Sequence, residues 1–565
     1  MGLDEYRIGC MKNLVVQNIS RLIVVIFPLC AVSCAFAGIV KGKTYVISPA
    51  GCDRSALFVE NSSPDDGAAV VLWTDTRVPA QQWRVVKNKN GTFSFVNVYT
   101  GKYLSVGGDA AADGAVLVQV AGNGAGAEWT AEPQGKEKDS YVLFKNADGK
   151  RFALVADGSN DGTRLFLSEQ VTDIAKANCG VWRLVETEPV TEFTESIRDE
   201  MAGAWLRHHR RERGGGLITF GDGGGWDDAE MLEVMLDAYE TTGNREYIDA
   251  FEDMFGFFRE RVGDNWLHLV YKDGYKWFGH DFNDDVMWMV IASARAYRLT
   301  GKEVYRKLAV DNFDAVYRRA YNRWGMMRWA EKSGHPNGTN SCINGPTEVA
   351  ACYIAQSLDT DSLREKYFEI ARGLYENQRR YLFVEQTGQV LDCFTWNAET
   401  DVPEKYNRWV STYNQGTMLG AAIMLYKRYG DEKYKRDADN IVECTRRELC
   451  NGHGVVKVCQ TIDGDLCGFK GILMRYLREY IVEMQHPELV EWLKNNAFHA
   501  FNNRNSRGVT WSAWLTKSTE NWISSVEKDD KENYKSYFNC AFGNSTAVSA
   551  AVNVPFAAAQ GRKGK

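Results

Sequence analysis

From residue 193 onward, the chain repeats one pattern: a mostly apolar stretch, a turn that contains Gly or Pro, and an amphipathic stretch with a period near 3.6 residues. The apolar stretches begin near residues 226, 284, 346, 415, 469 and 544, and an opening helix is expected near 194–210. Apolar helices that alternate with amphipathic ones, about twelve in all, predict a closed all-α (α/α)6 barrel over residues 195–555. Its inner helices should all run in the same direction.

The starts of these inner helices should therefore meet at one end of the barrel, however far apart they lie in the sequence. Carboxylates, amides and aromatic rings recur there, as is typical of a polysaccharide cleft. Each motif alone also fits an ordinary helix start, because Asn and Asp cap helices and Pro346 suits a first turn. Their recurrence at successive starts favours a binding site. The residues concerned are Trp226, Asp227, Asp228, Asn283, Asp284, Asp285, Asn344, Tyr413, Asn414, Gln415, Asp465, Phe469 and Lys470.

Two adjacent carboxylates, Asp284 and Asp285, stand where a polar stretch gives way to the apolar run 286–292. We expect them in the first turn of a buried helix, where free backbone N–H groups favour negative charge. Their carboxyl groups can lie roughly 5 to 6 Å apart, near the separation that retaining glycosidases use. Like charges so close cannot comfortably both ionise, so one pKa should be raised. The alternative is that Asp284 caps the helix and Asp285 complements its dipole.

The composition excludes some partners and favours others. At 565 residues the chain is long enough for two or three domains. A net charge of −7 without a long basic block argues against nucleic acid. The 17 tryptophans and 26 tyrosines favour flat, neutral ligands such as sugars. No group of Cys and His has zinc-ligand spacing, so neither a metal nor a cofactor is expected.

Residues 1–37 have the features of a signal peptide. Arg21 precedes an apolar stretch, and Ala35 and Ala37 supply small residues before a cut ahead of Gly38. The stretch is too short to span a bilayer comfortably, so no membrane span is expected. Met11 is an alternative start, and a lipid anchor at Cys34 is less favoured. We expect an exported protein that is secreted, periplasmic or on the cell surface.

An exported chain can form disulfides. Removing the signal segment leaves ten of the 13 cysteines. The candidates close in sequence are Cys444 with Cys450 and Cys459 with Cys467.

Residues 38–187 show short alternating strands and no helical period. Three units of roughly 45 to 50 residues close on Trp83, Trp129 and Trp182, which we expect in the core. This region resembles a ricin-B-type β-trefoil, whose signature Gln-x-Trp is complete only at Gln81. That family usually has an Asp early in each repeat to hold sugar hydroxyls, and the matching positions here are Phe58, Ser105 and Leu154. Residues 188–194 form a linker, and residues 556–565 form a tail.

The helical part resembles glycoside hydrolase family 76, the endo-α-1,6-mannanases, over roughly residues 195–553. The motifs that carry the resemblance are Asn283–Trp288, Asn340–Pro346, Thr412–Thr417 and Phe469–Ile472. It implies an (α/α)6 barrel and a retaining mechanism, with Asp284 as nucleophile and Asp285 as acid/base. Asp392 matches a position that binds sugar next to the cleaved bond. At Gly225–Trp226 relatives often carry two aromatics, so the distal subsite there differs. The predicted substrate-binding residues are Trp226, Asp228, Asn283, Asn344, Asp392, Tyr413, Asn414, Gln415, Phe469 and Lys470.

The predicted function is hydrolysis of α-1,6-mannosidic bonds in α-mannan with retention, with a second glycan bound by the trefoil. One alternative is a mannosyl transglycosylase of cell-wall glycans, in which a sugar hydroxyl replaces water. Another is a glycan-binding protein without catalysis, which the intact pair at 284 and 285 disfavours. A third is a different (α/α)6 enzyme such as an uronyl hydrolase, which the Thr412–Gly416 stretch disfavours.

Overall fold

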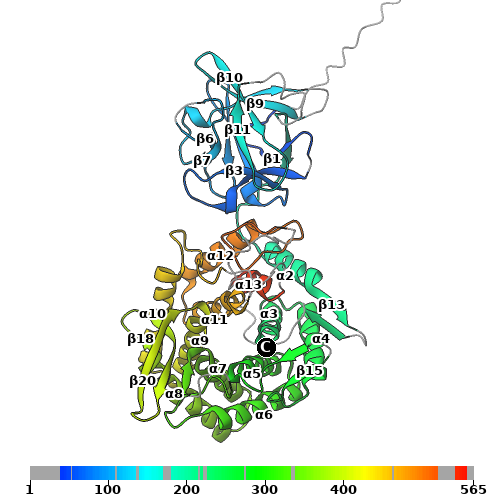
Figure 1. The fold of residues 1–565 in the computed structure, drawn as a ribbon. Coiled ribbons are helices and arrows are strands. Elements are labelled where there is room, and N and C mark those ends of the chain that lie inside the picture. The colour runs from blue at the N-terminus through cyan, green and yellow to red at the C-terminus, as the bar shows by residue number, and fades with distance from the viewer. Residues whose placement is uncertain are drawn as a thin grey trace, which may run out of the picture. The chain divides into compact units, whose positions relative to one another are not determined.

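The computed structural model describes residues 38–556 except 53, 109–110, 135–138, 170–179, 214–216, 221–224, 273–274, 333–336, 461–463 and 520–540. The predicted signal segment and residues 557–565 of the predicted tail lie outside these ranges. A β-rich region, which ends at Thr187, precedes a helical region, which begins at Glu195 (Figure 1). Within the described ranges, no helix is both long enough and apolar enough to cross a bilayer.

The β-rich region is one sheet of twelve strands. They are β1 (Thr44–Pro49), β2 (Ser55–Val59), β3 (Val70–Thr74), β4 (Gln82–Lys87), β5 (Phe93–Asn97), β6 (Tyr103–Val106), β7 (Leu117–Val120), β8 (Thr130–Pro133), β9 (Ser140–Ala147), β10 (Lys150–Ala156), β11 (Thr163–Ser168) and β12 (Trp182–Thr187).

Antiparallel pairing gives this sheet an internal threefold repeat. The strands β1, β4, β5, β8, β9 and β12 pair in that order and close back on β1, with β5 and β8 joined by the bridge between Phe93 and Trp129. The remaining strands form the hairpins β2–β3, β6–β7 and β10–β11. These hairpins also pair with one another, β3 with β11 and through bridges at Ala69–Val118 and Val116–Phe166. The pairing follows the three repeats in the sequence.

The three tryptophans that close the repeats lie in the core, as predicted. Each is fully buried. The indole N–H groups of Trp83, Trp129 and Trp182 donate to equivalent backbone carbonyls earlier in the same repeat, at 3.2, 3.0 and 2.9 Å. Burial of a large ring is favourable only when its N–H finds an acceptor, and here each repeat supplies one. The acceptors are the carbonyls of Leu57, Leu104 and Leu154.

The helical region alternates two kinds of helix. The mostly buried ones are α3 (Trp226–Thr242), α5 (Asn283–Thr300), α7 (Ser341–Ser357), α9 (Thr412–Tyr429), α11 (Phe469–Glu483) and α13 (Ala541–Val552). The others are α2 (Glu195–His209), α4 (Arg245–Val262), α6 (Glu303–Ala320), α8 (Asp361–Leu382), α10 (Glu432–Cys444) and α12 (Val490–Asn502). Short strands lie between them: β13 (Arg210–Arg213), β14 (Leu217–Phe220), β15 (Val270–Lys272), β16 (Tyr275–Trp277), β17 (Gly338–Asn340), β18 (Phe383–Val384), β19 (Gln389–Asn397) and β20 (Val402–Val410).

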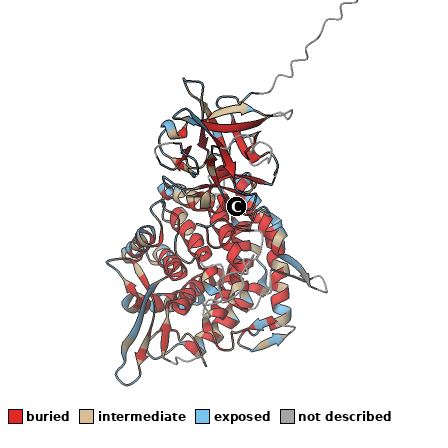
Figure 2. Cartoon of the chain, turned by 45° about the horizontal axis from the view of Figure 1, so that its top comes forward, coloured by how far each residue is buried: buried red, intermediate tan, exposed pale blue. Residues whose placement is uncertain are grey.

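The mostly buried helices form a closed inner ring. Each of them contacts the next mostly buried helix along the chain, and the last one, α13, contacts the first one, α3 (Figure 1). Nearly every residue of α7 and every residue of α13 is buried, whereas α8 and α10 bury one stripe and expose the other, a contrast visible in Figure 2. The helices α9 and α11 approach closely at Gly420, where a Cβ would lie 2.4 Å from the ring of Tyr476. Only glycine fits at this contact.

Two expectations from the sequence are wrong. Helix α7 begins at Ser341, directly after β17, so Pro346 lies inside the helix and not in its first turn. Among the described residues, Cys444 is not joined to Cys450 by a disulfide, nor Cys459 to Cys467. The Cys444 thiol is buried, and the Cys459 sulfur accepts a hydrogen bond from the Thr412 hydroxyl at 3.6 Å.

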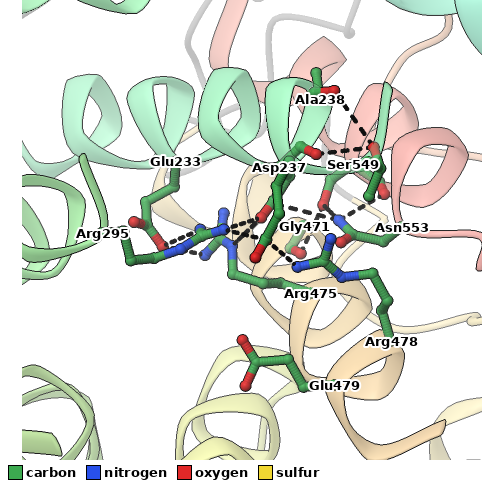
Figure 3. Close-up of polar contacts among 12 residues, drawn as sticks. Glu233, Asp237, Ala238, Arg295, Gly471, Arg475, Arg478, Glu479, Ser549 and Asn553 are labelled. Atoms are coloured by element: carbon green, nitrogen blue, oxygen red, sulfur yellow. Dashed lines mark hydrogen bonds and ion pairs between the residues drawn. The ribbon is translucent and has the colours of Figure 1, made fainter. Parts of the chain in front are cut away.

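A buried network of charges ties α3 to the helices on both sides of it (Figure 3). The Asp237 carboxylate accepts from Arg295 of α5 at 2.7 Å, from Arg475 of α11 at 2.9 Å and from Asn553, directly after α13, at 3.2 Å. The same helices add further ion pairs, from Arg295 to Glu233 and Glu240, from Arg475 to Glu230 and Glu233, and from Arg478 to Glu240.

The charges in this network nearly balance. Burial raises the pKa of Glu230 to about 7, against the opposing charge of Arg475. Burial also acts to raise the pKa of Asp237, but Arg475 and Arg295 hold it below its usual value. With Glu230 protonated, three carboxylates face three guanidinium groups. The network therefore links the second helix of the region to the last one and holds the ring closed.

Replacing Asp237 with Asn should lower the free energy of unfolding by about 3 to 5 kcal/mol, because two arginines stay buried without their shared carboxylate. Chemical denaturation followed by tryptophan fluorescence measures this loss. The matched control is Asp361→Asn on α8, whose carboxylate is fully exposed, and it should change stability by less than about 0.5 kcal/mol. Equal stability of the two variants would contradict the role given to Asp237.

Candidate active site

The starts of the inner helices meet at one end of the ring, as predicted from the sequence. The ring of Trp226 in α3 lies 5.9 Å from Trp288 in α5, 5.7 Å from Phe469 in α11 and 4.9 Å from Phe542 in α13, measured between centroids. Tyr413 of α9 stacks on Phe469 with centroids 3.8 Å apart and planes 19° from parallel. Aromatic side chains from five helices thus line one mouth.

Asp284 presents a free carboxylate oxygen in this mouth. Its Oδ2 accepts a hydrogen bond from the Trp329 indole at 3.1 Å, and the Cys342 thiol of α7 faces the same carboxylate. Its buried Oδ1 accepts no hydrogen bond from an N–H or O–H group of the described residues. The residue at the N-cap of α5 is Phe282, which makes no side-chain cap. The alternative in which Asp284 serves as the helix cap is therefore wrong.

Asp285 follows in the same helical turn and is buried. Burial raises the pKa of Asp284 to about 7. The pKa of Asp285 lies well above its usual range because of burial and then the charges of Asp284, Asp465 and Asp227. Burial and the neighbouring charges thus disfavour ionisation of Asp285, while the hydrogen bonds that Asp284 accepts favour its ionised form. One group can attack as an anion while its neighbour donates a proton.

Three further carboxyl groups surround the pair. Burial, with the charge of Asp465, raises the pKa of Asp227 to about 6. Burial and the charge of Asp227 raise the pKa of Asp228, whose Oδ2 accepts from the Tyr275 hydroxyl at 2.7 Å. Asp465 accepts from the Trp226 indole at 3.0 Å. In the part of the chain that the structure describes, no lysine or arginine is among the groups that shift these pKa values. Such an acidic mouth suits a neutral sugar better than a uronic acid.

Asp392 lies beside this mouth, on β19. Its Oδ2 accepts from the Asn407 amide at 2.9 Å, and its Oδ1 accepts from the Asn414 amide at 3.4 Å. Burial raises its pKa. The side-chain carbonyl oxygen of Asn414 is buried and accepts no hydrogen bond within the described ranges.

Three other predicted substrate-binding residues use their amide groups inside the protein. Each is fully buried. The side chain of Asn283 binds the segment that carries Trp329, and its backbone N–H donates to the Trp329 carbonyl at 2.9 Å. In the same way, Asn344 binds the backbone of Met327 and Asn340, and Gln415 binds that of Gly388 and Val390. The observed contacts are positioning ones; contact with substrate stays a prediction.

Lys470 is also fully buried. Its ammonium group donates to the Ser512 carbonyl and lies 4.1 Å from the centroid of the Trp514 ring. The Trp514 indole donates to Thr546 of α13 at 3.3 Å. Lys470 therefore anchors the irregular segment before α13 at the start of α11, and its predicted contact with substrate also stays a prediction.

Sequence reasoning did not select Trp329 or Cys342 as site residues, and it placed Asp227 and Asp465 at the helix starts without counting them among the substrate-binding residues. All four lie either in the first turn of an inner helix or in the segment that leads into one. Since every such segment ends at the mouth, its aromatic and acidic residues were the available signal.

Comparison with known proteins agrees with this geometry. The sequence profile described as Glycosyl hydrolase family 76 matches residues 196–536, which is more than half of the chain. The chain belongs to glycosyl hydrolase family 76. The profile described as Ricin-type beta-trefoil lectin domain-like matches residues 79–168. No curated protein matches the chain.

Several solved structures of family 76 share the fold of the helical region. The GH76A α-1,6-mannanase from Salegentibacter sp. HEL1_6 is 22% identical, with 63% of this chain and 98% of that chain covered and a TM-score of 0.50. An inactive variant of that enzyme, with two consecutive aspartates changed to asparagine, was solved with α-1,6-mannotriose (23% identity, 63% and 98% covered, TM-score 0.51). A family 76 mannosidase from Bacteroides thetaiotaomicron VPI-5482 is 16% identical, with 64% and 97% covered and a TM-score of 0.51.

With Asp284 as the expected nucleophile and Asp285 as the expected acid/base, kcat/KM should rise as pH approaches about 7, the pKa of Asp284, and fall again where Asp285 ionises. The charge of Asp465 raises both pKa values. Asp465→Asn keeps an acceptor for Trp226 and should move both limbs of the pH profile to lower pH. The exposed Asp361→Asn serves as control. A profile of Asp465→Asn that overlies the wild-type profile would contradict the electrostatic account.

Proposed function

We propose that the protein is a retaining glycoside hydrolase that cleaves α-1,6-mannosidic bonds in mannan within an (α/α)6 barrel, and that its β-trefoil region binds a second glycan. The observation that carries the proposal is the adjacent pair Asp284 and Asp285 at an aromatic mouth, where hydrogen bonds favour the ionised form of Asp284 and burial beside Asp284 disfavours that of Asp285.

In the proposed mechanism, Oδ1 of Asp284 attacks the anomeric carbon while Asp285 gives its proton to the leaving glycosidic oxygen. Water then attacks the covalent intermediate, Asp285 takes a proton from that water, and the bond to Asp284 breaks. The indole of Trp329 and the thiol of Cys342 favour the ionised form of Asp284 and so its release as a carboxylate. Interception by a sugar hydroxyl would give transglycosylation, and product analysis with added acceptor sugar distinguishes the two outcomes.

The proposed specificity for mannan rests on two arguments. One is the family to which the chain belongs, and the other is that the acidic mouth suits a neutral sugar. The inactive relative with two consecutive aspartates replaced holds α-1,6-mannotriose, and this supports the same pair and the same linkage here. The carboxyl groups of Asp227, Asp228 and Asp465, which have no basic partner among the described residues, argue against negatively charged uronyl substrates.

Asp284→Ala and Asp285→Ala should each lower kcat/KM on linear α-1,6-mannan by a factor of about 10³ or more, since each removes a group that acts in the transition state. Reducing-sugar release measures the loss. Azide should restore turnover to the Asp284 variant with inverted product, because it takes the place of the missing carboxylate and attacks from the face opposite the leaving group. Full activity in either alanine variant would falsify the assignment. Asp361→Asn, a change at an exposed carboxylate, is the control and should keep wild-type activity.

For the trefoil, the positions that usually carry the sugar-binding Asp are Phe58, Ser105 and Leu154, and all three are buried. A surface cavity of about 600 Å³ is lined by Asp66 of the first repeat and by Ser105 and several glycines of the second, and we propose it as the glycan site. We also propose export, on the basis of the signal-like segment that ends at Ala37.

A further inference from the structure

The hairpin of β19 and β20 departs from regular pairing next to the mouth. Leu391 pairs with Val410 and Cys393 pairs with Asn407. One residue of β19, Asp392, therefore faces two residues of β20, Arg408 and Trp409. This is a β-bulge, a device that redirects a side chain and is common beside active sites.

The bulge fixes Trp409 relative to Asp392 through a single side chain. The side-chain Oδ1 of Asn407 accepts from the Trp409 backbone N–H at 3.1 Å, while the Nδ2 of the same side chain donates to Asp392 at 2.9 Å. A shift of Trp409 would disturb the hydrogen bonds of Asp392, so the two are positioned together.

The ring of Trp409 is 41% exposed, and its centroid lies 6.2 Å from that of Phe469. Phe469 in turn stacks on Tyr413, whose pKa is raised by burial and then by the nearby charges of Cys342, Asp392 and Asp284. Trp409 thus stands two rings away from the nucleophile, at the outer edge of the aromatic mouth. A large ring left exposed beside a group of aromatic and acidic side chains favours contact with an apolar face of a ligand.

A second bulge on the same strand provides a comparison. Phe394 of β19 faces Lys405 and Tyr406 of β20, and Lys405 adopts φ +56°. Tyr406 is 37% exposed, but its ring packs on Phe394, 5.2 Å away, within the separate cluster around Trp396. The two bulges display similar aromatics, and only Trp409 contacts the rings of the mouth.

We infer that Trp409 is a substrate-binding residue that stacks on a mannosyl ring at a subsite beyond Asp392, so that the β19–β20 hairpin sets the length of glycan bound. The inference rests on the proposed function. The negative face of the indole attracts the C–H groups on one face of a pyranose, and the polar edge of the sugar stays available to hydroxyl acceptors such as Asp392.

The test compares kcat/KM for linear α-1,6-manno-oligosaccharides of increasing length in the wild type, Trp409→Ala, Trp409→Phe and Tyr406→Ala. Trp409→Ala should lower kcat/KM by about tenfold for the longest substrates, the loss expected for one stacking contact, and much less for the shortest substrate cleaved. Trp409→Phe should recover most of the loss, and Tyr406→Ala should match the wild type.

A loss in Trp409→Ala that is equal for all lengths, or no greater than that of Tyr406→Ala, would overturn the inference and leave the proposed function intact. Failure of the wild type to cleave any of the oligosaccharides would overturn both. Thermal unfolding of all four proteins shows whether each variant is folded.

Discussion

In the described part of the chain, buried carboxyl groups of α3 pair with arginine side chains deep in the ring, whereas no arginine pairs with the carboxyl groups at its mouth. Glu233 and Asp237 of α3 pair with Arg295 and Arg475, and the negative charge is neutralised where it holds the ring closed. Two to three turns earlier, Asp227 and Asp228 have no such partner, and their pKa values rise. The same helix therefore carries charges that stabilise the fold at one depth and charges poised for chemistry at another.

The unpaired carboxyl groups are costly to bury, and the surrounding structure offsets that cost. Fully buried amides hold the segments that frame the mouth, as Asn283 holds the segment with Trp329 and Gln415 holds the start of β19. The ion network around Asp237 and the close contact of α9 with α11 at Gly420 keep the inner helices in place. Burial at the mouth is then maintained although it disfavours ionisation of Asp285.

Much of this arrangement follows from the sequence. The period near 3.6 and the recurring turns predicted the six helix pairs, and the common direction of the inner helices predicted that their starts would meet. The direction in which each side chain points could not be predicted from the sequence. Asn283, Asn344 and Lys470 occupy predicted positions, yet their polar groups bind the protein backbone, because the partners come from segments distant in sequence.

Irregular segments were the least predictable. Trp329 reaches Asp284 from the segment before β17, and the bulge at Arg408–Trp409 depends on the register of β19 against β20, which no local pattern specifies. Helix α7 begins five residues before Pro346 because its first turn continues directly from a strand. In contrast, the tryptophans of the β-rich region were predictable, since a threefold repeat places each of them in an equivalent position.

The central claim is that neighbouring carboxyl groups at 284 and 285 act in two displacements at one carbon. The most direct measurement is ¹H NMR of the wild-type reaction on linear α-1,6-mannan, recorded before mutarotation. The account predicts that the reducing end appears first as the α anomer. First appearance of the β anomer would show a single displacement and would contradict it.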